Sequence, residues 1–248
     1  MTNYLIVHNT TKVSFGEALS TMRKPTRFWI GCVTLMNRAW IGQSLAFQQQ
    51  RSTTTAPSSR RGDAFTRQLP SLRPFHKRVF LIRHGQTNWN KVGKVQGGGF
   101  DIELNENGVE QAQRVAQELS SIPIGVIASS HLQRSLQTAN RIHYPASLIQ
   151  RIVDQRFGEM RFGDFEGTVI HGPRALATNK QRFASMRHQM QEDIHVKWPG
   201  EGGESTHDVS RRGKVALESL LDRYPDEDHV AVVAHGRFNK VLLATLLY

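Results

Sequence analysis

The stretch VFLIRHGQTNWN, residues Val79–Asn90, joins an apolar strand directly to a run of polar and charged residues. Its first four residues are apolar and have the length of a short buried strand, and Arg83, His84 and Gly85 follow without a break. A glycine at this place permits a sharp turn and the close approach of a ligand. The pattern therefore predicts a strand that delivers a reactive histidine to its carboxyl end.

Strands and helices alternate along residues 77–248. Val230–Ala234 and Ile124–Ala128 are further apolar runs of strand length. Helices are expected after Asn105 and after Ser205, because both residue types cap helix N-termini. This alternation predicts an α/β fold, a three-layer sandwich whose mainly parallel central sheet has helices on both faces.

The carboxyl ends of these strands concentrate groups that bind phosphate. His84 and His235 each follow a strand and precede a glycine, and ligands of open α/β sheets bind at this end of the strands. The third strand leads through Ser129–Ser130, the expected cap, into a helix with Arg134 in its first turn. Helix N-termini and arginine forks both bind phosphate. Each group alone has an ordinary explanation as a turn or a solvated side chain, but together with Arg83 they predict a phosphate site.

The positive charge of the chain lies in its N-terminal third. Residues 1–78 contain 12 Lys and Arg against two acids, whereas the remainder contains 20 against 19. A nearly neutral domain gives no support to a nucleic-acid partner. Residues 1–76 are rich in Ser, Thr and Arg, and Gln48–Gly62 is of low complexity, which predicts a transit peptide and linker for a mitochondrion or plastid. The alternative is a basic tail that stays attached to a cytoplasmic protein.

The number of cysteines and the length of the apolar segments limit the kinds of site and partner that the chain can have. Cys32 is the single cysteine, which allows neither an internal disulfide nor a cysteine-based metal site. The longest apolar segment, Phe28–Phe47, is interrupted by Asn37 and Arg38 and falls short of a membrane span. A membrane anchor in this segment is the weaker alternative, and no membrane partner is expected.

Short motifs follow one another in a fixed order from Arg78 to Tyr248. They are Arg83–Asn90 (RHGQTNWN), Gln96–Gly97, Gly108–Ala112 (GVEQA), Ser129–Arg134 (SSHLQR), Phe157–Gly167 (FGEMRFGDFEG), Gly202–Ser205 (GGES) and Ala234–Gly236 (AHG). In this order they resemble the histidine phosphatase superfamily, in the branch that contains the cofactor-dependent phosphoglycerate mutases and their phosphatase relatives. The resemblance covers the whole chain except the leader.

The resemblance implies a role for each matching residue. His84 is the nucleophile that forms a phosphohistidine, and Glu159 is the general acid that protonates the leaving oxygen. Arg83, Arg134 and His235 hold the phosphate and complete the catalytic set. The substrate-binding residues that it implies are Arg83, Asn90, Gln96, Gly97, Arg134, Glu159 and Gly236.

Other groups are assigned no part in the chemistry. Glu166, the rival carboxylate to Glu159, is expected to be structural because it lies in the following turn. No metal or organic cofactor is implied, since arginines and histidines supply the positive charge.

Phosphatases and mutases share this phosphohistidine and differ in the group that accepts the phosphate. We predict a phosphomonoester phosphatase acting on a small phosphorylated metabolite, because the segment between Glu159 and His235 is shorter than the resemblance implies for mutases. Its basic residues are expected to be mostly solvated positions on a small helical lid. One alternative is a 2,3-bisphosphoglycerate-dependent phosphoglycerate mutase. Another is a non-catalytic relative that binds a phosphorylated ligand, although His84, Glu159 and His235 are all present. The oligomeric state stays open.

The C-terminal segment departs from the family pattern. Phe238–Tyr248 is apolar on nearly all sides and is therefore predicted to be buried. Relatives continue beyond this helix, so the domain of residues 77–248 is expected to be truncated at its C-terminus. Arg237 stands where relatives often have a small residue, and Lys240 stands in place of an arginine.

Overall fold

The central feature of the molecule is one mainly parallel sheet. The computed structural model describes residues 4–6, 69, 71–72, 74, 76–142 and 149–247. The strand order is β1-β2-β5-β3-β4, and every neighbouring pair except β1 and β2 is parallel. The strands are β1 (Tyr4–Ile6), β2 (Arg78–Arg83), β3 (Val126–Ser129), β4 (Gln150–Val153) and β5 (His229–Ala234).

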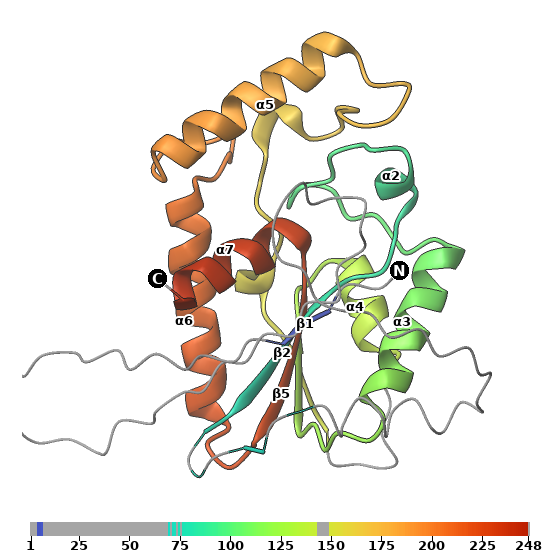
Figure 1. Ribbon diagram of the computed structural model, residues 1–248, viewed down its shortest axis with the longest axis vertical. Coiled ribbons are helices and arrows are strands. Elements are labelled where there is room, and N and C mark those ends of the chain that lie inside the picture. Colours follow the sequence, from blue (N-terminus) through green and yellow to red (C-terminus); the bar gives the residue numbers. More distant parts are fainter. Residues whose placement is uncertain are drawn as a thin grey trace, which may run out of the picture.

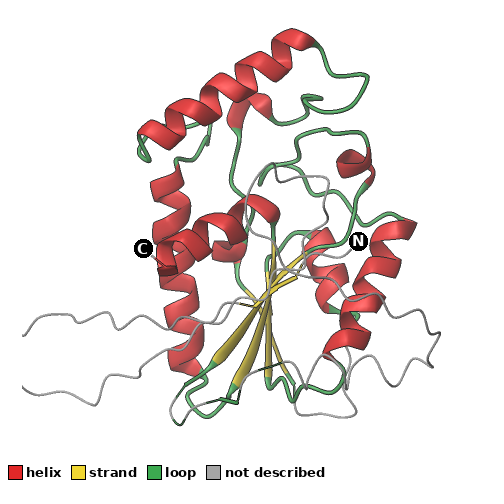
Figure 2. Ribbon diagram, viewed as in Figure 1, coloured by secondary structure: helices red, strands yellow, loops and turns green. Residues whose placement is uncertain are grey.

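Helices cover both faces of this sheet. Figure 1 shows α6 (Thr206–Arg223) and α7 (Gly236–Leu247) on one side, and α3 (Glu106–Leu119) and α4 (Gln133–Ala139) on the other. The strands lie between the two groups of helices (Figure 2). The predicted three-layer α/β sandwich is confirmed.

Alternation along the strands separates the core into two halves. Phe80 and Ile82 of β2 pack with residues of α3, whereas Val79 and Leu81 pack with residues of α6 and α7. Successive side chains of a strand point to opposite faces, so a strand that is covered on both sides needs a continuous apolar run. This requirement explains why the run that precedes Arg83 has no polar interruption.

A further group of helices lies beyond the carboxyl ends of the strands. α5 (Ala177–Glu192) crosses the end of the molecule toward which β2 and β5 run (Figure 1). It buries Phe183 and Met190 and otherwise exposes polar side chains. The short helices α2 (Asn88–Lys91), η1 (Gln155–Phe157) and η2 (Gly163–Phe165) belong to the connecting segments. α5 is the helical lid that the sequence predicts.

The sequence predicted two of the helix starts correctly and one incorrectly. Asn105 and Ser205 cap α3 and α6 as predicted, and the Ser205 capping box is complete. The predicted cap at Ser129–Ser130 is wrong, because α4 starts at Gln133 and its N-cap residue, Leu132, makes no side-chain cap bond. The hydroxyl of Ser130 instead accepts a hydrogen bond from the Leu132 N–H at 3.2 Å, which turns the chain before the helix begins.

Two further expectations concern the ends of the chain. The prediction that Phe238–Tyr248 is buried is wrong for its later part, since Leu247 is 39% exposed. The buried residues of α7 are Phe238, Asn239, Val241 and Leu242, and the helix packs on α6. The predicted transit peptide lies almost entirely outside the described residues and stays a prediction; within it, β1 pairs with the edge of β2.

Candidate active site

The two strand-ending histidines lie side by side because β2 and β5 are adjacent and in register. Arg83 is paired with Ala234, so His84 and His235 are the next residues on each strand. The His84 N–H donates to the Ala234 carbonyl at 3.0 Å, which extends the ladder by one bond. The centroids of the two imidazole rings are 5.1 Å apart. The sheet register thus brings together the two histidines that the sequence predicts.

The His84 imidazole has a defined tautomer and charge. Its Nδ1 donates to the carbonyl of Gly85 at 2.7 Å, because a carbonyl can only accept. Burial holds the pKa of His84 well below its ordinary value, and the charges of Arg83 and Arg134 lower this pKa further. The ring is therefore neutral at pH 7, and its Nε2 lone pair is available for attack on phosphorus.

The loop after His84 packs closely against the start of α3. A Cβ on Gly85 would collide with the Gly108 backbone, so this contact requires glycine. The Gly85 N–H donates to the Thr138 hydroxyl at 3.0 Å, and this hydroxyl donates to the Arg134 carbonyl at 2.7 Å. Thr138 therefore links the histidine loop to α4, a role that its sequence position did not reveal.

Arg134 is held rigidly although it is almost fully buried. Its Nη1 donates to the Phe100 carbonyl and its Nη2 to the Gly97 carbonyl, both at 2.7 Å. The residue is 1% exposed, and burial lowers the pKa of its guanidinium. A guanidinium that is fixed by backbone carbonyls pays little entropy on binding an anion.

Several buried side-chain donors converge near His84. Within the described chain, Arg83 Nε, Arg134 Nε and both ring nitrogens of His235 are buried and have no hydrogen-bond partner. Burial, followed by the charges of His84, Arg134 and Arg83, holds the pKa of His235 well below its ordinary value. A neutral imidazole donates from one ring nitrogen only, so His235 adds one donor to those of the two arginines. Buried donors of this kind require an acceptor. Their chemistry fits an anion such as a phosphoryl group.

Glu159 lies against the first turn of α7. Its Oε1 accepts hydrogen bonds from the N–H groups of Met160 and Phe238, both at 2.9 Å, and its Oε2 accepts from the Arg237 N–H at 3.1 Å. α7 starts directly after His235, so the carboxylate and this histidine are positioned by the same helix. The Glu159 side chain thus lies at the amino end of α7.

Glu166 has structural contacts, as the sequence indicated. Its carboxylate accepts from the N–H of Gly99 at 3.1 Å and from that of Phe162 at 2.9 Å. It thereby joins the loop that carries Gly97 to the loop that carries Glu159. Burial raises the pKa of Glu166.

Arg212 of α6 forms hydrogen bonds to the backbone of the loop that contains Glu159. Its guanidinium donates to the carbonyls of Arg156, Gly158 and Glu159, at 2.7, 2.9 and 3.2 Å. It also pairs with Glu204 through bonds of 2.8 and 3.0 Å. Sequence reasoning missed Arg212, because an arginine in the middle of an amphipathic helix looks like a solvated residue.

Asn90, Gln96, Gly97 and Gly236 complete the predicted substrate-binding set, and their binding role stays a prediction. Asn90 uses its Oδ1 to accept from the Thr87 N–H within the capping box of α2. Gln96 is buried, and Gly97 contributes the carbonyl that holds Arg134. A Cβ on Gly236 would stand 3.1 Å from Arg83 Nε, so this glycine makes room for the arginine.

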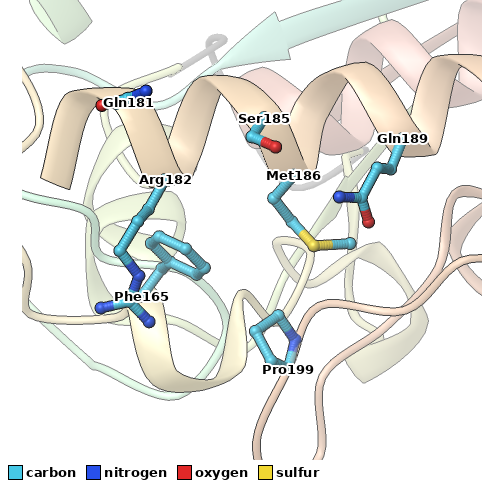
Figure 3. A pocket seen from close by; sticks show the side chains of 7 residues that line it. All are labelled: Phe165, Gln181, Arg182, Ser185, Met186, Gln189 and Pro199. Atoms are coloured by element: carbon cyan, nitrogen blue, oxygen red, sulfur yellow. The ribbon is translucent and has the colours of Figure 1, made fainter. Parts of the chain in front are cut away.

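Two cavities lie on either side of α5. The larger has a volume of about 390 Å³ and contains none of the residues of the phosphate site; its lining includes Phe165, Arg182 and Pro199 (Figure 3). The second, of about 320 Å³, is lined by residues that include His171, Lys180 and Arg187. The larger cavity therefore lacks the histidines and the buried arginines of the phosphate site.

Two other kinds of site were searched for in the described residues. No group of three or more His, Cys, Asp and Glu side chains is arranged there to hold a metal ion. No helix in this part of the chain combines the length and apolar character that crossing a membrane needs.

Known proteins resemble this chain in sequence and in structure. A sequence profile of the histidine phosphatase superfamily (branch 1) matches residues 79–248. Phosphoglycerate mutase-like protein 4 of Arabidopsis thaliana is 34% identical over 160 residues, which are 64% of this chain and 66% of that protein. The match thus spans slightly less than two thirds of that relative's length.

Two solved structures of phosphatases are also similar. A mycobacterial glucosyl-3-phosphoglycerate phosphatase, solved with VO3, is 32% identical, with a TM-score of 0.57 over 67% of this chain and 80% of that chain. A phosphoserine phosphatase of Entamoeba histolytica, solved with 3-phosphoglyceric acid, is 29% identical, with a TM-score of 0.56 over 68% of this chain and 79% of that chain.

Proposed function

The chain belongs to the histidine phosphatase superfamily, branch 1, and on this premise we propose that it is a phosphomonoester phosphatase acting through a phosphohistidine. The substrate class is a small phosphorylated metabolite. The observation that carries the proposal is a neutral His84, fixed through Nδ1, beside buried and unpartnered donors of Arg83, Arg134 and His235.

The proposed reaction has two steps. In the first, His84 Nε2 attacks phosphorus, the P–N bond forms, the ester P–O bond breaks, and Glu159 gives a proton to the leaving oxygen. In the second, water attacks phosphorus, Glu159 takes a proton from it, the P–N bond breaks, and inorganic phosphate leaves. The donors of Arg83, Arg134 and His235 stabilise the charge on the equatorial oxygens in both steps. The proposed chemistry requires no metal or organic cofactor.

The first step requires Glu159 to carry a proton when the ester binds. In the structure three N–H groups contact its carboxylate, and two of them belong to the first turn of α7. Its Oε2 accepts one of the three bonds, and the second lone pair of this oxygen can carry the proton. The same donors stabilise the carboxylate after transfer, which favours bond cleavage.

A phosphoglycerate mutase is the second candidate function, since the name of the Arabidopsis relative is mutase-like. The phosphatases among the solved structures favour hydrolysis instead. In a mutase an acceptor hydroxyl would replace water in the second step, and 2,3-bisphosphoglycerate would charge His84. A non-catalytic phospho-ligand-binding protein is the third candidate, and the presence of both His84 and Glu159 argues against it.

The full chain, assayed with a panel of phosphomonoesters and with 3-phosphoglycerate, distinguishes these functions. Phosphate release without 2,3-bisphosphoglycerate is the expected result, together with an acid-labile phosphoenzyme. Isomerisation of 3-phosphoglycerate that depends on the bisphosphate would establish the mutase instead. Tight phosphate binding with neither phosphate release nor isomerisation would establish the non-catalytic relative.

A further inference from the structure

Two histidines that take no part in the proposed reaction lie together where α5 leads into α6. The ring centroids of His195 and His207 are 4.5 Å apart, and the ring planes are tilted by 39°. His195 is exposed and His207 is half-buried. Within the described residues, no hydrogen bond or ion pair involves either imidazole. A neutral imidazole has one nitrogen with a free lone pair, so each ring offers a ligand atom that the protein itself does not use.

Backbone hydrogen bonds hold these two histidines near each other. Figure 1 shows the segment that runs from the end of α5 to the start of α6. Asp193 follows the last residue of α5, and its Oδ1 accepts from the His195 N–H at 2.8 Å. His207 lies in the first turn of α6, and its N–H donates to the Ile194 carbonyl at 2.9 Å. The proximity of the rings is therefore built into the main chain of both segments.

The spacing of the two rings suits a shared metal ion. Imidazole is the commonest metal ligand in proteins, and it binds Zn²⁺ and similar divalent ions well. Two nitrogens bound to one tetrahedral Zn²⁺ at about 2.0–2.1 Å lie about 3.3 Å from each other. The ring nitrogens lie off the centroids, so rotation of the exposed His195 ring can bring one nitrogen of each ring to this separation. Water fills the remaining positions, as it does in zinc sites with fewer than four protein ligands.

The charges around the two rings also favour a cation. None of the ion pairs in the described chain involves Asp193, whose carboxylate contacts the backbone of His195. The Lys197 ammonium is paired with Asp208 Oδ2 at 3.4 Å, so its charge is offset. A negative charge that is not matched by a neighbouring cation attracts a metal ion.

We propose that His195 and His207, here called the histidine pair, bind Zn²⁺ and that the ion ties the end of α5 to the start of α6. The site is separate from the proposed reaction, which uses no metal, and does not depend on it. α5 buries only two of its side chains within the described structure, Phe183 and Met190. An element with so few buried contacts opens easily, and a metal bond at its end opposes that opening.

Other histidines of the chain supply the controls. His188 is an exposed imidazole near the end of the same helix, and its Nδ1 lies 3.9 Å from Glu192 Oε1. His188→Gln therefore removes an ordinary surface imidazole without touching the histidine pair. The rings of His84 and His235 are also close, with centroids 5.1 Å apart. Zn²⁺ bound at those two active-site histidines would be retained by His195→Gln and by His207→Gln, whereas Zn²⁺ bound at the histidine pair would be lost.

Calorimetric titration of the full chain with ZnCl₂ tests the site. His195→Gln and His207→Gln should each weaken the binding of Zn²⁺ by about tenfold or more, because the loss of even an outer partner of a metal ligand costs about 10- to 100-fold. His188→Gln should bind Zn²⁺ as the wild type does. Without Zn²⁺ all four proteins should melt at the same temperature, since the backbone bond of His207 to Ile194 does not involve the imidazole. Failure of the wild type to bind Zn²⁺, or equal binding by the wild type and both variants of the histidine pair, would overturn the site.

Hydrogen exchange tests whether the bound ion restrains α5. Zn²⁺ should slow exchange in α5 of the wild type and of His188→Gln, and it should leave exchange in His195→Gln and His207→Gln unchanged at the same Zn²⁺ concentration. Unchanged exchange in α5 of the Zn²⁺-saturated wild type would show that the ion does not tie the two helices. Slowing that persists in both variants would assign the effect to Zn²⁺ bound elsewhere and would overturn the proposal.

Discussion

Two regions of the molecule, here called the catalytic floor and the cover, are held in place by different interactions. The floor comprises the ends of β2 and β5 with α4, and it holds Arg83, His84, Arg134 and His235 by sheet register and backbone hydrogen bonds. The cover is α5, which buries two side chains and exposes most of the others. Hydrogen bonds fix the positions of the side chains in the floor, whereas one aromatic cluster holds the cover in place.

This difference suits the floor to the proposed reaction. Groups that stabilise charge during transfer must be fixed in advance, which suits a sheet edge. Groups that select a substrate tolerate more variation and suit an element with few buried contacts. Phe183 of α5 packs against Trp198, Phe165 and Phe162, with centroid distances of 4.9, 5.6 and 6.1 Å, and so anchors the cover.

The largest effect is expected from removal of the floor's nucleophile. His84→Ala should abolish the phosphoenzyme and lower kcat/KM for p-nitrophenyl phosphate by about 1,000-fold or more, as for other covalent catalysts. Acid-quenched incubation with a radiolabelled phosphomonoester and steady-state kinetics measure the two quantities. The matched control in the cover is His188→Ala, which alters an exposed imidazole and should retain both. An active His84→Ala enzyme would show that the floor does not carry the chemistry.

The next effect distinguishes the two carboxylates that flank the floor. Glu159→Gln should lower kcat about 100- to 1,000-fold for an alkyl phosphate, the lower part of the range that general acid catalysis supplies. The loss of kcat should be smaller for p-nitrophenyl phosphate, because the departure of its leaving group depends less on protonation.

Glu166→Gln serves as the comparison for Glu159→Gln. It should weaken the bonds to Gly99 and Phe162 and cost about 1–3 kcal/mol of unfolding free energy, with a loss of kcat that does not depend on the leaving group. A leaving-group dependence found for Glu166→Gln instead would transfer the acid role to Glu166.

The floor could be predicted from the sequence because its signals are local. An apolar run followed by His-Gly marks both β2 and β5, and adjacency in a parallel sheet then joins their ends. The cap at Asn105 and the capping box at Ser205 could also be predicted from the local sequence. Identification of Glu159 required the family resemblance, since nothing local distinguishes it from Glu166.

The edge strand β4, the supports of the site and the rotation of the cover helix could not be predicted in the same way. β4 is mostly exposed and contains Gln150 and Arg151, so it lacks the apolar run that marks a strand. The contacts of Arg212 with three carbonyls depend on how α6 packs, and the difference between Arg182 and Arg187 depends on how α5 is rotated. These contacts arise from tertiary packing, and the local sequence around the residues gives no signal of them.

A smaller effect tests whether the cover unfolds separately from the floor. Phe183→Ala should cost about 3 kcal/mol by opening a cavity in the aromatic cluster, whereas Phe183→Leu should cost about 1 kcal/mol. Hydrogen exchange should then accelerate in α5 while β2 and β5 retain their protection. Equal acceleration in β5 would show that floor and cover form one cooperative unit, and the comparison between them would fail.

The smallest effect comes from a histidine at the opposite end of β5 from the active site. Burial, and then the charge of Arg78, lower the pKa of His229 to about 4, against the opposing charge of Asp228. The ordinary pKa of about 6.5 applies in the unfolded chain. The folded value is the lower of the two, so the unfolded chain binds the proton first. The contribution of His229 is therefore complete above pH 6.5 and decreases as the pH falls toward 4.

His229→Gln removes this dependence while the other buried histidines remain. The difference in unfolding free energy between wild type and His229→Gln should shrink by about 1–2 kcal/mol between pH 7.5 and pH 4.5, a range that allows for partial contact with solvent. Urea denaturation at the two pH values measures it, and His84 and His235 cancel because both proteins contain them. His188→Gln in the cover is the control variant, because its side chain is 73% exposed. If His188→Gln and His229→Gln respond alike, water reaches the amino end of the sheet as freely as it reaches the cover, and burial does not lower the pKa of His229.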